Sequence, residues 1–202
     1  MSWKSMALQC VDTPLHIYNR GVDGQVIFRE EPDYLRWMEF FTEMQQKHGV
    51  TVFLYALIPN HFHISLSQSQ PYEVSGYIKD VCWRYARYHN RKYRRHGPLF
   101  SGRFRVTLVP EDTGLLRLSH YIHMNPVKAG LVHEPEQWPH SSIARYVDGD
   151  ASPGMDVSRI LNLVGGTDNY RRFLTAYNPA DALSINEDLV HGNIKATVQN
   201  RM

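Results

Sequence analysis

Two histidines one residue apart, His61 and His63, form the first arrangement in the sequence that could do chemistry. They fall in the returning arm of a predicted hairpin, after a turn at Pro59-Asn60. Residues two apart in a strand point to the same face, so both imidazoles would share one side while Phe62 packs on the other. Neutral imidazole nitrogens bind divalent metals. The pair predicts a bidentate metal site, although two exposed or structurally satisfied strand histidines would show the same spacing.

The third predicted helix carries Tyr121, whose phenol could act as a nucleophile in a covalent mechanism. Asn125 follows four residues later, so the two side chains share a helix flank beside the buried stripe. We expect Tyr121 to be accessible there, and its usual pKa of about 10 means that a metal or a base must assist it. Each residue also has a non-catalytic interpretation. Tyr121 could be a tyrosine at the edge of the buried face with no chemical role, and Asn125 could cap the turn that begins at Pro126.

A strongly basic stretch runs from Lys79 to Arg105 in a chain whose net charge is only +2. Asp80 is its only acid, and aromatic residues are interleaved with its cations. Cations meet phosphates while rings stack on unpaired bases, so the stretch indicates a nucleic-acid partner. The alternative is a solvated basic helix face with core aromatics. The candidate DNA contacts are Arg84, Arg87, Arg91, Lys92, Arg94, Arg95, Arg103 and Arg105.

The elements that must position these groups follow from hydrophobic periodicity. We predict strands at 15–18, 51–58 and 61–67, extended chain at 99–109, and helices at 33–47, 74–93 and 112–125. The order strand, helix, strand, strand, helix, strand is that of the ferredoxin-like split βαβ fold. This is an α+β class with an antiparallel sheet and its helices on one face. The third helix is appended to it.

Length and composition indicate the class of protein and its domain organisation. The chain has 202 residues, of which 43% are hydrophobic and 21% charged, a globular composition. We expect residues 1–147 to form the domain and 148–202 a C-terminal extension, with short helices at 157–164 and 169–177 and a tail. Two cysteines exclude a disulfide scaffold. No apolar stretch is long enough to span a membrane, so we expect a cytoplasmic protein, nucleoid-associated when bound to DNA.

Three segments together resemble one family. The His-hydrophobe-His motif of single-strand DNA transposases and relaxases has a counterpart in LIPNHFHI (57–64). The segment before their last strand resembles FSGRF (100–104), and their nucleophile helix resembles YIHMNPVKAGLV (121–132). From about Leu15 to Tyr146 the chain is most similar to REP-associated tyrosine transposases. These belong to the HUH superfamily and have a single catalytic tyrosine.

This resemblance implies a metal-dependent reaction that cleaves and rejoins single-stranded DNA at REP-like hairpins, in a monomer or a dimer. His61 and His63 would hold Mg²⁺ or Mn²⁺, and Asn125 falls where relatives place a polar third ligand. Tyr121 would become joined to the 5′ end of the cut strand. A catalytically silent hairpin-binding protein is the alternative on the same scaffold. A metal hydrolase with an activated water would need a further carboxylate, which the motif does not offer.

Overall fold

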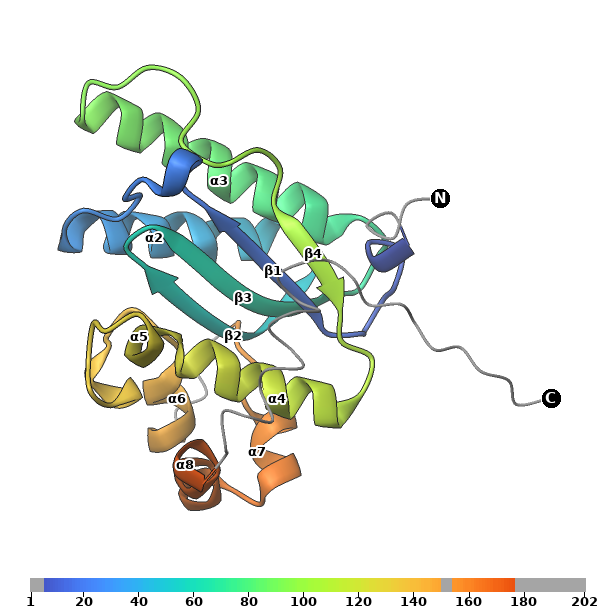
Figure 1. The fold of residues 1–202 in the computed structure, drawn as a ribbon. Helices are drawn as coiled ribbons and strands as arrows, with labels where there is room; N and C mark the ends of the chain where they lie inside the picture. Colours follow the sequence, from blue (N-terminus) through green and yellow to red (C-terminus); the bar gives the residue numbers. More distant parts are fainter. Residues whose placement is uncertain (1–5, 150–153, 177–202) are drawn as a thin grey trace.

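The computed structural model describes residues 6–149 and 154–176. Its elements follow the predicted order (Figure 1). In chain order they are β1 (Leu15–Arg20), the short 3₁₀ turn η1 (Val22–Gly24), α2 (Glu31–Lys47), β2 (Val50–Ile58), β3 (His61–Gln68), α3 (Glu73–Lys92), β4 (Arg105–Leu108), α4 (Asp112–His123), α5 (Asn125–Lys128), the second 3₁₀ turn η2 (Pro135–Gln137), α6 (Ile143–Asp148), α7 (Ser158–Val164) and α8 (Thr167–Ala176).

Four strands form one antiparallel sheet in the order β2-β3-β1-β4. Because α2 joins β1 to β2 and α3 joins β3 to β4, this is the predicted split βαβ arrangement. The last strand is shorter than the extended chain that the sequence suggests. Phe100 makes only an isolated bridge with Gly21, and the chain then turns at Gly102, whose φ of +76° favours glycine. Regular pairing with β1 therefore begins at Arg105.

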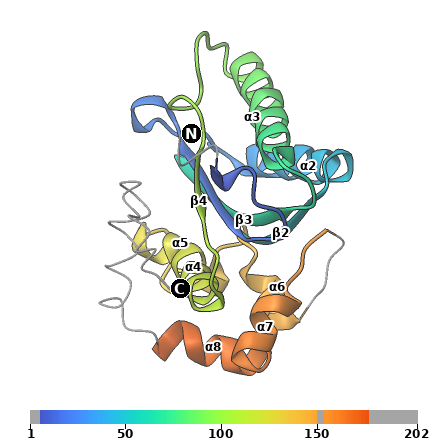
Figure 2. The ribbon, with the colours of Figure 1, turned by 90° about the vertical axis from the view of Figure 1, so that its right-hand side faces the viewer.

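Helices α2 and α3 lie side by side on one face of the sheet (Figures 1 and 2). Phe62 points from β3 into this layer and is fully buried against Trp37 of α2, with ring centroids 4.8 Å apart. Tyr85 of α3 is also buried, and its hydroxyl donates a hydrogen bond of 2.6 Å to the Ile27 carbonyl. This layer is the one-sided helical cover that the ferredoxin-like pattern predicts.

The appended helices α4 to α8 cover the opposite face of the sheet (Figures 1 and 2). The reason lies in β2, whose residues VTVFLYALI are almost all apolar. Leu57 belongs to the core under α2 and α3, whereas Ala56 and Ile58 belong to a second core with Leu115 and Ile122 of α4. A strand that is apolar on both faces requires cover on both.

Helices α7 and α8 share the second core with α4, through side chains that include Ile160 and Tyr170. The Tyr170 hydroxyl lies 2.7 Å from His123 Nδ1, and His123 Nε2 lies 2.8 Å from Ser142 Oγ. The first bond connects α8, and the second the start of α6, to the helix that carries Tyr121. The predicted tail at 177–202 lies outside the described residues. Within the described ranges, no helix combines the length and apolar character that crossing a membrane requires.

Candidate active site

His61 and His63 lie on β3 and face the second helical layer, while Phe62 between them faces the first. His63 pairs with Tyr18 of β1 on one side and with Ala56 of β2 on the other. The two imidazole centroids are 5.1 Å apart, and the rings are nearly perpendicular. The shared face that the spacing predicts is therefore present.

Tyr121 lies on α4 above these histidines. Its ring centroid is 5.2 Å from that of His63, and the rings meet edge to face. The prediction that Tyr121 is accessible is wrong, because the residue is only 7% exposed and belongs to the second core. Burial follows from the close packing of α4 against the apolar face of β2. The phenol is therefore held directly over the histidine pair.

Asn125 reaches the same place from α5. Its Oδ1 lies 2.9 Å from His61 Nε2. The alternative role as a cap is wrong, because Met124 occupies the N-cap of α5 and no side chain makes a capping bond there. Pro126 has no N–H to donate, so the helix is interrupted at Met124, yet Met124 keeps a near-helical backbone. The four-residue spacing thus still brings Tyr121 and Asn125 to the same site.

The surroundings of His61 leave one ring nitrogen available as an acceptor. Asn60 Oδ1 lies 2.7 Å from Nδ1, opposite the contact of Nε2 with Asn125. Burial lowers the pKa of His61, against the opposing effect of the Asn125 hydrogen bond, so the ring is neutral and carries one N–H. Both ring nitrogens face amide oxygens, so the single N–H donates to only one of them. When Nδ1–H donates to Asn60, Nε2 presents its lone pair beside Asn125 Oδ1, and both atoms can then bind a metal.

Two further side chains of β1, His16 and Tyr18, belong to this site, although the sequence patterns did not single them out. His16 Nε2 lies 3.0 Å from His63 Nδ1, and the His16 and His63 rings stack with centroids 5.1 Å apart. Tyr18 lies across from His63, with ring centroids 5.7 Å apart. The period-two alternation of His16, Tyr18 and Arg20 in a predicted strand was the available signal.

The donor set fits a divalent metal of the kind that the resemblance implies. His61 and His63 supply neutral nitrogens, since burial lowers the pKa of His63 well below its usual value, and the neighbouring His16 and His61 act in the same direction. Asn125 supplies an oxygen. Asn125 Oδ1 lies 2.9 Å from His61 Nε2, so the two atoms are close enough that both could contact one ion. Among residues 6–149 and 154–176, no cluster of three His, Cys, Asp or Glu side chains could hold a metal.

The Tyr121 phenol needs assistance to react. Burial raises its pKa above the usual value, and Tyr18 nearby adds to the effect, so the phenol is neutral at pH 7. Lys128 places its ammonium 5.2 Å from the centre of the Tyr121 ring, and burial lowers the pKa of Lys128. Lys128 is a third side chain of this site, after His16 and Tyr18, that the sequence patterns did not single out.

The predicted DNA contacts fall in two places. Arg105, at the start of β4, hydrogen-bonds the Tyr18 phenol and so lies on the histidine side of the sheet. The arginines of α3 belong instead to the layer on the other side (Figure 2). The basic stretch of the sequence is therefore divided by the sheet.

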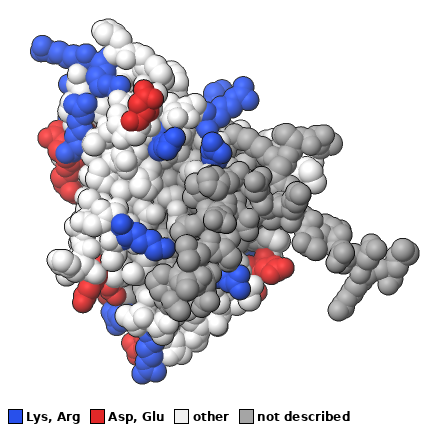
Figure 3. Space-filling model, viewed as in Figure 1, with Lys and Arg blue, Asp and Glu red and all other residues white. Residues whose placement is uncertain are grey.

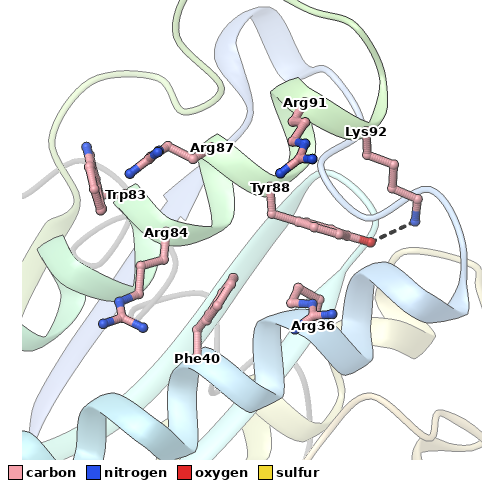
Figure 4. Close-up of a pocket in the computed structure, with 8 residues that line it drawn as sticks. All are labelled: Arg36, Phe40, Trp83, Arg84, Arg87, Tyr88, Arg91 and Lys92. Carbon is pink, nitrogen blue, oxygen red and sulfur yellow. Dashed lines mark hydrogen bonds between the residues drawn. The ribbon is translucent and has the colours of Figure 1, made fainter.

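A groove between α2 and α3 gathers much of this charge (Figure 4). Its volume is about 670 Å³. Trp83 on its rim is 56% exposed, and the Arg87 guanidinium lies 4.6 Å from the Trp83 ring centre. The residues that line it are Arg36, Phe40, Trp83, Arg84, Arg87, Tyr88, Arg91 and Lys92.

Three of these cations are paired with acids of α2 and its N-terminus, the first being Arg36 with Glu39. Arg84 meets both carboxylate oxygens of Glu43, at 2.9 and 3.0 Å. Lys92 donates to Glu30 and to the fully buried Asp33, at 2.7 and 2.6 Å. Lys92 stays a predicted DNA contact, but its ammonium already neutralises a buried carboxylate.

Asp33 joins α2 to the end of α3. Burial acts to raise the pKa of Asp33, but hydrogen bonds from Lys92, Tyr93, the Arg29 amide and Tyr88 outweigh it and lower the pKa. The carboxylate therefore stays ionised in the core.

The remaining predicted cations are available to a partner to different degrees. Figure 3 shows basic side chains near the top of the molecule, over the end of α3 and the loop after it, with acidic side chains close by. Arg95 meets Asn90 at 3.3 Å and is partly buried. The exposed members of the predicted set are Arg87, Arg91, Arg94, Arg103 and Arg105.

A split βαβ sheet with two histidines on a central strand, under a tyrosine from the helix after the last strand, defines the class of single-tyrosine transposases. The chain belongs to the IS200-like transposase family, whose profile matches residues 15–125.

Individual relatives agree with this placement. A Haemophilus influenzae protein with the provisional name REP-associated tyrosine transposase is 31% identical over 108 residues. The match covers 48% of this chain, which spans about three fifths (61%) of that relative. A solved structure of a REP-associated tyrosine transposase bound to a REP hairpin has a TM-score of 0.61 at 15% identity, covering 74% of this chain and 90% of the other. At that identity the likeness shows the fold alone.

Proposed function

We propose that this chain is a metal-dependent strand transferase that cuts and rejoins single-stranded DNA through a 5′-phosphotyrosine. The observation that supports the proposal is the convergence of Tyr121, His63, His61 and Asn125 from two helices and one strand. A phenol, two neutral imidazoles and an amide oxygen are the groups that this reaction requires.

The reaction needs an in-line nucleophile and neutralisation of the phosphate charge. The Tyr121 oxygen forms a bond to phosphorus, the bond from phosphorus to the 3′ oxygen breaks, and that oxygen takes up a proton as a free hydroxyl. The phenol proton leaves to water, and the Lys128 ammonium over the Tyr121 ring is the cation that we propose to assist its loss. Mg²⁺ or Mn²⁺ held by His61, His63 and Asn125 would polarise the phosphate. Since the phosphotyrosine keeps the phosphoester bond, attack by a 3′ hydroxyl rejoins the strand.

The substrate we propose is hairpin DNA of the REP type with a single-stranded flank. The likeness in fold to a transposase that binds a REP hairpin supports this choice. Arg105 is suited to the strand that enters the Tyr121 site, because it lies beside Tyr18. The exposed arginines of α3 and the loop after it would contact other phosphates. The reaction would take place in the cytoplasm, beside the nucleoid.

The test is to trap the covalent intermediate. Labelled hairpin DNA with a single-stranded flank is incubated with the protein and Mn²⁺, and the products are separated under denaturing conditions. We expect a DNA adduct that persists through denaturation and that disappears in Tyr121→Phe. Tyr72→Phe is a matched control, because this exposed phenol lies at the start of α3, away from the site.

Each other outcome identifies a competing function. Binding of the hairpin with no cleavage by the wild-type protein would favour the catalytically silent binding protein. Cleavage without an adduct would favour a hydrolase that uses an activated water. An equal adduct with Tyr121→Phe would remove Tyr121 from the nucleophile role.

A further inference from the structure

His16 is a buried histidine in direct contact with a proposed metal ligand. It is 1% exposed and lies on β1, and its Nε2 is 3.0 Å from Nδ1 of His63. We propose that His16 is a positioning residue, which fixes His63 in the tautomer whose Nε2 can bind a metal. This inference rests on the proposed function, because it concerns the same site.

The hydrogen bond between His16 and His63 determines which nitrogen of His63 carries the proton. A bond between two imidazole nitrogens needs one ring to donate and the other to accept. If His63 Nδ1–H donates to His16 Nε2, then His63 Nε2 carries a lone pair. If His16 Nε2–H donates instead, His63 carries its proton on Nε2 and cannot coordinate through that atom. Only the first arrangement gives a metal ligand. Ligating histidines generally need such an outer partner, which sets both tautomer and ring orientation.

Ring geometry adds a second constraint. His16 and His63 stack with an angle of 19° between their planes, and Tyr121 meets both rings edge to face. His63 is thus held between a hydrogen-bond partner and the proposed nucleophile. A shift of His16 would change the direction of His63 Nε2 relative to Tyr121.

A purely structural role fits His16 poorly. Its other nitrogen, Nδ1, is buried and has no hydrogen-bond partner in the described part of the chain. Ser65 and Thr107 lie across from His16 on the neighbouring strands, and the Ser65 hydroxyl also has no partner among the described residues. An unpaired buried nitrogen destabilises the fold, and an apolar side chain would avoid that cost. The bond to His63 is what an apolar residue could not supply.

Two substitutions separate hydrogen bonding from packing. In His16→Gln, the amide oxygen can take the place of Nε2 and accept the proton of His63 Nδ1. In His16→Leu, the core stays filled but no acceptor remains. Ser65→Ala is the matched control, because it removes a buried polar atom from the same face and leaves the bond between His16 and His63 in place.

The first readout needs no metal. Nitrogen-15 NMR of the metal-free protein reports which nitrogen of each histidine carries the proton. We expect His63 to be protonated on Nδ1 in the wild-type protein, in His16→Gln and in Ser65→Ala, and to lose this preference in His16→Leu. A wild-type His63 protonated on Nε2 would overturn the proposal, even if no variant folds.

The second readout is calorimetric titration with Mn²⁺ alone. We expect His16→Leu to bind Mn²⁺ between about 10-fold and 100-fold more weakly, with His16→Gln and Ser65→Ala close to wild type. Unchanged affinity in a folded His16→Leu, or equal losses in the Leu and Gln variants, would refute the role of His16. If the wild-type protein binds no Mn²⁺ while His63 is protonated on Nδ1, the metal site fails and the tautomer assignment to His16 stands.

Discussion

Mild acid should destabilise this protein through histidines that are buried in the neutral form. Burial lowers the pKa of His16 and of His123 to about 3, and His120 nearby adds to the effect at His123. In the unfolded chain both return to about 6.5. Protons therefore bind the unfolded state first as the pH falls. The stabilisation that these rings provide is fully present above pH 6.5 and is lost below it.

The size of the loss follows from the two pKa values. At pH 5.5 an unfolded histidine holds about nine tenths of a proton, whereas a buried one with a pKa of about 3 holds almost none. Between pH 7 and 5.5 each residue lowers the free energy of unfolding by about 1.2 kcal/mol, and His16 and His123 together by about 2.5 kcal/mol. Single domains have only about 5–15 kcal/mol in total, so the change is large.

Urea denaturation at pH 7 and at pH 5.5 measures this difference, with the fluorescence of the buried Trp37 among the signals. Carboxylates interfere little in this range, because their unfolded pKa values are about 4. His123→Gln should reduce the loss between the two pH values by about 1.2 kcal/mol, whatever its effect on stability at pH 7. An unfolding free energy that is the same at both pH values would refute the reasoning, as would an identical loss in His123→Gln.

Three further outcomes are expected. Replacing Arg87 and Arg91 together by Ala should make the slope of log affinity for hairpin DNA against log salt concentration less negative by about 1.4. Arg84→Ala removes a cation that is already paired with Glu43, so it should change the slope less. Equal effects would contradict the distinction between paired and available cations. Lys92→Met should lower the urea-derived unfolding free energy by about 3 kcal/mol, because the buried Asp33 carboxylate then has no cationic partner. A loss under 1 kcal/mol would show that this ion pair is not buried in solution. Asn125→Ala should weaken Mn²⁺ binding measured by calorimetry. It should also lower the free energy of unfolding by about 1 kcal/mol, because the hydrogen bond to His61 is lost. Unchanged Mn²⁺ affinity would remove Asn125 from the set of metal ligands.

The order of strands and helices was predictable because it depends on local periodicity. The alternation His61-Phe62-His63 placed both imidazoles on one face, and the structure agrees. The environment of Tyr121 was not predictable, because its burial depends on β2, which lies more than sixty residues earlier in the chain. The spacing of apolar residues in a helix shows which of its sides is apolar, but not how closely that side packs against the sheet.

The pairing of charged side chains was the least predictable feature of the structure. In sequence the basic stretch stands apart from acids, yet in the fold α2 lies beside α3 and brings Glu43 and Asp33 against two of its cations. The contact of His16 with His63 likewise joins residues forty-seven positions apart. Such pairings depend on strand register and helix packing, which single-sequence patterns do not contain.

The division of the molecule into two cores gives the halves of the active site unequal resistance to thermal opening. His61 and His63 sit on a strand that has hydrogen-bonded neighbours on both edges and helices over both faces, so its amides should exchange with solvent last. Tyr121 is carried by a helix that side chains hold over the sheet. Partial opening of the second layer would therefore separate Tyr121, the proposed nucleophile, from the histidines while the sheet and α3 stay folded. Heating should therefore abolish the proposed strand cleavage before it abolishes the proposed binding of DNA by α3.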